Sequence, residues 1–386
     1  MEFSRRDVLN GAVAAVGAAM MSSTVSKAQA QKGAGARSRP ANEPFGYCLN
    51  TSTIRGNKLD LPGVIGAASK AGFQALEPWI SEIDAYTTGG GTLKDLGKRI
   101  ADAGLTVEGA IAFNSFLDDD DTRRAAALEK LKADMDKVAQ IGGKRIAAPP
   151  GNNRTAAVTL DNAAKYYREA LEMGEKIGVQ PLLELWGTHP VLGPLSHGIY
   201  VTVAAGRADA SLLLDVFHLY KSGTPFTALR QINGAALHVM HLNDYPQAAD
   251  PATLNDGNRV YPGDGVAPFR QILRDLRDNG FRGYLSLELF NKEYWGRSAD
   301  ENLKTAMEKI RPPCARRWRR GRVWSADSRL STGASLGAAR LTTARRYDDT
   351  TIPRALSTRR LTKKSRNLFD GLRLLVPPRR QQRESR

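Results

Sequence analysis

The most restrictive feature of this chain is a pair of patterns that repeats between residues 45 and 310. An apolar stretch typical of a β-strand is followed by an amphipathic helix, and the pair occurs eight times. Each repeat takes about 33 residues, the size of one strand–helix unit in a barrel of roughly 250 residues. Most apolar stretches are continuous, as expected for parallel strands buried on both faces. They are 45–54, 73–80, 105–113, 145–150, 179–186, 211–219, 235–242 and 284–290.

An open, doubly wound sheet is the main alternative for such a pattern. It would favour a glycine-rich, phosphate-binding turn after the first strand, and the segment Asn50-Thr51-Ser52-Thr53 is not one. We therefore predict an α/β fold, a (β/α)8 TIM barrel over residues 45–310. In that fold, catalytic residues lie at the carboxyl ends of the strands. Helices are expected to end at the glycines Gly72, Gly104, Gly142, Gly178 and Gly280.

Residues 1–30 have the features of a twin-arginine export signal. Arg5-Arg6 precedes an apolar run over 11–21, and Ala28-Gln29-Ala30 offers a cleavage site. The run has about half of the ~20 residues that span a bilayer, so we expect export to the periplasm without a permanent membrane anchor. A buried N-terminal helix is the alternative. Residues 31–44 are expected to form a flexible linker.

The formal net charge of +16 belongs entirely to the C-terminal segment. Residues 311–386 hold 21 basic and 5 acidic side chains, which leaves 35 of each in the rest of the chain. The segment has no sustained apolar period, so we expect a basic tail of low order. Three interpretations remain open for this tail: a basic arm that binds nucleic acid or a membrane, a disordered extension, or the product of a shifted reading frame. The balanced barrel itself indicates a small ligand and no nucleic-acid partner.

Four residues that can bind a metal end four successive predicted strands: Glu184, Asp215, His241 and Glu288. A carboxylate in an apolar strand is costly unless a cation compensates it, and a buried ion pair is the alternative for any one of them. Together they predict one divalent metal ion. Three carboxylates and one imidazole favour Mn, Mg, Co or Zn. Glu77, which closes the second strand, is expected to make an ion pair or an extra polar contact.

At these residues the chain resembles the sugar isomerase/epimerase family with a xylose isomerase-like TIM barrel. Within it, the 2-keto-myo-inositol (inosose) isomerases are the most similar. The motifs that carry the resemblance are Asp215-Val-Phe-His218, His241 with Asp244-Tyr-Pro246, 258–265 and Leu287-Glu-Leu-Phe290.

The resemblance implies a divalent-metal-dependent isomerase or epimerase of a keto-sugar or inosose. Its metal ligands would be the four residues named above. Glu184 and Glu288 would also be catalytic, transferring a proton through a metal-stabilised enediolate. Substrate contacts are implied at His218, Arg259 and His189, while Trp186 either stacks on the sugar or packs in the barrel. A homo-oligomer is compatible with it.

Three other functions remain open for the same barrel. An enediolate with a leaving group on the next carbon can eliminate, which would make the chain a sugar or cyclitol dehydratase or lyase. A nuclease related to the abasic-site endonucleases would need more histidine ligands than this chain offers. A sugar-binding protein without catalysis is the last alternative.

Overall fold

The computed structural model describes residues 43–151 and 158–318, with side chains as far as Arg311. The predicted export signal, nearly all of the linker and the tail beyond residue 318 lie outside the described residues. The eight strands form one parallel sheet in the order β3-β2-β1-β8-β7-β6-β5-β4. Their bounds are β1 Gly46–Asn50, β2 Ala75–Glu77, β3 Thr106–Val107, β4 Arg145–Ala148, β5 Gln180–Glu184, β6 Leu212–Asp215, β7 Leu237–Leu242 and β8 Tyr284–Leu287.

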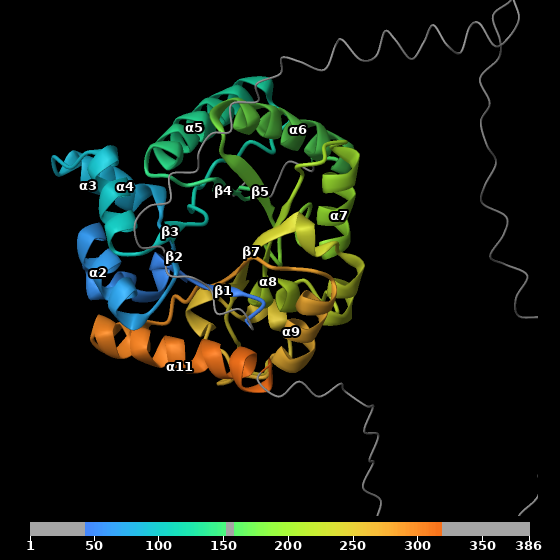
Figure 1. Cartoon of the computed structure of the whole chain (residues 1–386). Helices are drawn as coiled ribbons and strands as arrows, with labels where there is room; N and C mark the ends of the chain where they lie inside the picture. Colours follow the sequence, from blue (N-terminus) through green and yellow to red (C-terminus); the bar gives the residue numbers. More distant parts are fainter. Residues whose placement is uncertain (1–42, 152–157, 319–386) are drawn as a thin grey trace, which may run out of the picture. The chain divides into compact units, whose positions relative to one another are not determined.

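The two ends of this strand order also meet. The amide of Ala147 in β4 donates to the carbonyl of Ala110, three residues past β3, at 2.8 Å. Helices surround the strands (Figure 1), so the predicted TIM-barrel-like fold is confirmed. The helices are α2 Leu61–Ala71, α3 Ile80–Thr88, α4 Leu93–Asp102, α5 Asp121–Gln140, α6 Leu160–Ile177, α7 Leu195–Ala204, α8 Val216–Lys221, α9 Phe269–Asp278, α10 Lys292–Trp295 and α11 Ala299–Trp318.

Polar side chains and glycines set the ends of these helices. Asp60, Thr92, Asp120 and Thr159 cap α2, α4, α5 and α6, each accepting a hydrogen bond from a backbone amide in the first turn. At the other end, the five glycines predicted as caps all have positive φ, as the left-handed turn at a helix end requires. The helices therefore begin and end where local sequence chemistry directs.

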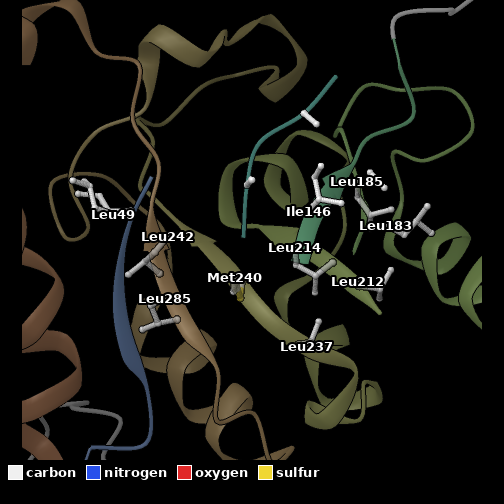
Figure 2. Packing of buried hydrophobic residues seen from close by; sticks show 14 of the residues in the cluster. Leu49, Ile146, Leu183, Leu185, Leu212, Leu214, Leu237, Met240, Leu242 and Leu285 are labelled. Atoms are coloured by element: carbon white, nitrogen blue, oxygen red, sulfur yellow. The ribbon is translucent and has the colours of Figure 1, made fainter. Parts of the chain in front are cut away.

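Two layers of apolar side chains hold the barrel together. The larger one lies between strands and helices, and Figure 2 shows Leu183, Leu214 and Met240 in it, from β5, β6 and β7. The smaller one fills the barrel interior with Ile111, Ala147, Leu182, Leu213 and Val239. Strand side chains two residues apart share a face. Glu184, Asp215 and His241 therefore stand directly above this inner layer.

Several predicted boundaries need correction. The predicted strand 105–113 is paired as a strand only at Thr106–Val107, and the predicted strand 45–54 turns into the 3₁₀ helix η1 (Thr51–Asn57) after Asn50. Residues 311–318, assigned to the tail, continue α11 as helix. Extending an existing helix costs less than starting one, so α11 can continue into a segment without a sustained apolar period. Within the described residues, no helix is long and apolar enough to cross a membrane.

Candidate metal centre and substrate cavity

All four predicted ligands lie at the carboxyl end of the barrel, and three of them, Asp215, His241 and Glu288, come close enough together to share one metal ion. Glu184 and Asp215 end β5 and β6, His241 lies one residue before the end of β7, and Glu288 directly follows β8. All four are buried. One ligand atom each of Asp215, His241 and Glu288 lie within 4.8 Å of one another. Glu184 lines the adjoining cavity together with Glu288.

His241 is oriented by a carboxylate that is not one of these ligands. Its Nε2 lies 2.9 Å from Oε2 of Glu77. A carboxylate oxygen accepts, so Nε2–H is the donor and the lone pair of the neutral ring is on Nδ1. Nδ1 faces Oε2 of Glu288 at 3.2 Å and Oδ2 of Asp215 at 3.7 Å. It is buried and makes no aligned hydrogen bond to a described residue.

Asn50 and Ser286 hold the carboxylates around His241 in place. Oε2 of Glu77 accepts the Ser286 hydroxyl at 2.7 Å and the Asn50 amide at 3.2 Å. The same Asn50 amide nitrogen donates to Oε1 of Glu288 at 3.0 Å. Its oxygen accepts the indole N–H of Trp79 at 3.0 Å. The network therefore connects β1, β2, β7 and β8 and limits how Glu77 and Glu288 can turn.

Arg259 is the fixed positive charge of this site. Its side chain is almost completely buried, and Nη1 donates to Oδ2 of Asp215 and Oε2 of Glu288, each at 2.7 Å. Nη2 donates to Oδ1 of Asp256 at 2.8 Å and lies 3.3 Å from Nε2 of His218. The guanidinium thus spans two predicted metal ligands and reaches the cavity wall.

The pKa values reflect how crowded these charges are. Burial raises the pKa of Glu184 to about 8, against the effect of the nearby His241. Burial would also raise the pKa of Glu288, but His241 and Arg259 bring it well below its usual value. For His241 burial is outweighed by Glu288 and Glu77, which raise its pKa. Burial lowers the pKa of His218 to about 4.

The donor set fits a divalent cation. Four buried carboxylates surround His241, and two of them form an ion pair with the guanidinium of Arg259. The buried Nδ1 of His241 faces two of these carboxylates, an arrangement that a proton on the ring completes in the cation-free protein and that a bound cation would complete in its place. The carboxylates are Glu77, Glu184, Asp215 and Glu288. Oxygen donors with one imidazole suit a hard or borderline ion.

A cavity of about 320 Å³ opens beside the ligands. This volume is at the small end of the range of roughly 300–1,000 Å³ for ligand pockets, and suits a single sugar or cyclitol ring. Ring centroids of Trp79 and Phe113 lie 5.1 Å apart, and those of Phe113 and Trp186 lie 6.0 Å apart. Together with Phe290 they line the cavity, with polar groups from Glu184, His218, Lys221, Asp256, Arg259 and Glu288.

Three of the four predicted substrate residues line the cavity, and His189 does not. His218, Arg259 and Trp186 line the cavity. His189 is buried, and its Nδ1 accepts the backbone amides of Val191 and Leu192 at 3.2 and 3.1 Å. That nitrogen therefore supports the loop after β5, and a substrate contact at His189 stays a prediction.

Sequence reasoning missed part of the site. Glu77 was expected to make an ion pair or polar contact, and its partner is the predicted metal ligand His241. Asn50, Ser286 and Phe113 were not singled out. Asn50 and Glu77 each end an apolar strand, a signal that could have marked them. Phe113 lies beyond β3 and lines the cavity with 48% of the residue exposed, and no such sequence signal marks it.

Comparison with known proteins finds enzymes among the relatives of this chain. An inosose isomerase of Bacillus licheniformis is 26% identical over 209 residues, 53% of this chain and 73% of that protein. A 3-dehydroshikimate dehydratase of Pseudomonas aeruginosa is 26% identical over 240 residues, 60% of this chain but 36% of that protein. Both relatives are enzymes, as expected for this chain. The suspected similarity to inosose isomerases is thereby confirmed.

A solved structure supports the fold in particular. The crystal structure of an IolI protein with a bound zinc atom superposes with a TM-score of 0.65 at 23% identity, covering 70% of this chain and 98% of that one. The sequence profile of the xylose isomerase-like TIM barrels matches residues 65–312, more than half of the chain. The chain therefore belongs to the xylose isomerase-like TIM barrel family.

Proposed function

We propose that this protein is a divalent-metal-dependent isomerase or epimerase of a keto-sugar or inosose. The observation that carries the proposal is the buried Nδ1 of His241. It lies between the carboxylates of Asp215 and Glu288, while Glu77 holds the other ring nitrogen. The similarity to an inosose isomerase supports the choice of reaction.

Asp215, His241 and Glu288 would hold the cation, with Glu184 as the fourth ligand. A cation in this place would act as a Lewis acid, polarising a substrate carbonyl so that the neighbouring C–H becomes acidic. Arg259 already contacts both Asp215 and Glu288. It would keep these carboxylates oriented for binding.

The two glutamates at the cavity wall would move the proton. Glu184 and Glu288 come from β5 and the end of β8, and both line the space where a ring would lie. One carboxylate removes the proton next to the carbonyl and the other returns it to the neighbouring carbon or the opposite face. Return to the neighbouring carbon gives isomerisation, and return to the opposite face of the same carbon gives epimerisation.

The cavity wall favours a polyol ring. Trp79, Phe113, Trp186 and Phe290 offer apolar surfaces for the C–H face of a sugar or cyclitol. His218 and Arg259 offer hydrogen bonds to its hydroxyl groups. Water would be displaced from the wall by the ring, which strengthens the polar contacts inside.

The test uses the full chain loaded with Mn²⁺ or Zn²⁺ and a panel of keto-sugars and inososes in D₂O. Exchange of the substrate's α-proton, followed by NMR, should be fast for the wild type and at least about 100-fold slower for Glu184→Gln and Glu288→Gln. Metal content is measured for each variant, so that loss of metal is separated from loss of the base. Glu82→Gln, which alters a carboxylate away from the cavity wall, is the matched control. Exchange at the wild-type rate in both glutamate variants would contradict the mechanism.

A dehydratase or lyase reaction is the second candidate, favoured by the similarity to a 3-dehydroshikimate dehydratase. The same α-proton abstraction, followed by loss of a hydroxyl from the next carbon, gives an unsaturated product. The NMR spectrum of the product distinguishes the two reactions. New vinylic protons would indicate elimination, and an isomer of equal mass would indicate isomerisation or epimerisation.

A further inference from the structure

Arg55 lies against the aromatic wall of the cavity. It belongs to η1, the 3₁₀ helix that follows β1 at the carboxyl end of the barrel. Its guanidinium carbon is 3.6 Å from the ring centroid of Trp79 and 6.0 Å from that of Phe290. Both rings line the cavity. A flat stack on Trp79 is a cation–π contact that fixes the plane of the guanidinium.

This guanidinium forms no ion pair with a carboxylate of a described residue. Its electrostatic neighbours, Glu82 and Glu288, already have other partners. Oε2 of Glu82 accepts the Thr51 hydroxyl at 2.5 Å and the Trp79 amide at 3.0 Å. Glu288 is held by Asn50 and Arg259. Arg55 is exposed, although the part of its side chain that is buried lowers its pKa.

Three arginines that are less exposed than Arg55 have acidic partners. Arg259, Arg145 and Arg207 each contact a carboxylate at 3.1 Å or less. A stacked guanidinium uses its faces and leaves its in-plane N–H groups to donate, and two parallel N–H groups match a carboxylate. Arg55 therefore has the geometry of a carboxylate receptor at the edge of the cavity.

We propose that Arg55 binds a carboxylate of the substrate, at the end of the molecule away from the reacting carbonyl. The proposal deepens the function proposed above and rests on it, because both concern the same cavity. It narrows the substrate class to keto-polyols that carry a carboxylate. Arg55 would act in binding and selection, while the glutamates act on the proton.

The experiment compares two probes that differ in one group. 5-Keto-D-gluconate carries a carboxylate where L-sorbose carries a hydroxymethyl group, and both are keto-sugars. Dissociation constants are measured by calorimetry on the metal-loaded full chain. We expect the wild type to bind the acid about 10- to 100-fold more tightly, as a charge-assisted bidentate contact implies. The preference should weaken at high salt.

Two variants of Arg55 and one control complete the design. Arg55→Gln should bring the two dissociation constants to within about 2-fold by weakening only the acid, and Arg55→Lys should keep part of the preference. Arg297→Gln is the matched control, because Arg297 also contacts an aromatic ring, that of Tyr294 at 5.3 Å, but this ring, unlike Trp79, does not line the cavity. It should leave the preference intact.

The outcome for Arg55 is separate from the outcome for the proposed function. Equal affinity of the wild type for both probes, or an unchanged preference in Arg55→Gln, would overturn the proposal. Neither result depends on turnover. Exchange of the α-proton, measured on the same samples, tests the proposed function, so one hypothesis can fail while the other stands.

Discussion

Nε2 of His241 and Oε2 of Glu77 lie 2.9 Å apart, although the two residues are 164 positions apart in the sequence. His241 is in β7 and Glu77 ends β2, and the strands β1 and β8 lie between these two strands in the sheet. Both side chains are buried. The contact orients the imidazole so that Nδ1 is available between Asp215 and Glu288, which makes Glu77 a positioning residue for the predicted metal centre.

We therefore expect Glu77→Gln to weaken divalent-metal binding. The amide cannot match the charge of the carboxylate beside the ring N–H, and losing such a partner typically costs about 10- to 100-fold in metal affinity. Competition with a chelator measures the affinity of the full chain for Zn²⁺. Glu82→Gln is the control, since Glu82 accepts hydrogen bonds from Thr51 and Trp79 instead. Equal metal affinity in wild type and Glu77→Gln would remove this role from Glu77.

The positions of the candidate ligands at the strand ends could be predicted because their signal is local. Glu184 and Asp215 interrupt apolar stretches at the point where a strand ends, and parallel strands bring those ends to one edge. The partner of His241 could not be predicted in this way. Which strand faces β7 across the barrel depends on how the sheet closes, and no single stretch of sequence contains that information.

The short length of β3 could not be predicted from the sequence, for a related reason. The apolar stretch 105–113 indicates a long strand, but pairing ends at Val107. At Gly109 the backbone passes so close to Glu77 that a Cβ would lie 2.7 Å from its Oε1. The path of this segment therefore depends on a carboxylate of the neighbouring strand, which hydropathy does not reveal.

Removing Arg259 should destabilise the cation-free protein and increase its response to metal. Arg259→Met leaves Asp215 and Glu288 buried without their counter-ion, which typically costs about 3–5 kcal/mol. A divalent cation would compensate the same carboxylates, so the difference from wild type should shrink when Mn²⁺ replaces the chelator. Urea unfolding under both conditions measures this. In Arg207→Met, which lacks the ion pairs to Glu175 and Asp209, metal should make no such difference. Equal metal stabilisation of wild type and Arg259→Met would contradict the prediction.

Asp244 should be essential to the loop that carries Arg259. Its Oδ1 accepts the amides of Tyr245 and Ala267, and its Oδ2 those of Gly263 and Gly265, all at 2.8–2.9 Å. In Asp244→Asn one acceptor becomes a donor that faces two backbone amides, so we expect a loss of about 2–4 kcal/mol in the free energy of unfolding. Asp264→Asn, in the same loop but partly exposed, should cost less than about 1 kcal/mol. Similar losses in both variants would show that the four bonds do not matter.

His238 should make the fold less stable in mild acid. Burial, reinforced by the positive charge of Arg145, lowers its pKa from 6.5 to about 4. In the unfolded chain the imidazole titrates near its usual pKa of ~6.5, so between about pH 6.5 and pH 4 the unfolded state binds a proton that the folded state does not. Stability therefore falls as the pH drops through this window, and His238→Gln should reduce the slope. The free energy of unfolding in urea, measured near pH 7.5 and near pH 5 with chelator present, checks this. The chelator keeps metal binding constant, and an equal loss in wild type and variant would assign the acid sensitivity to other groups.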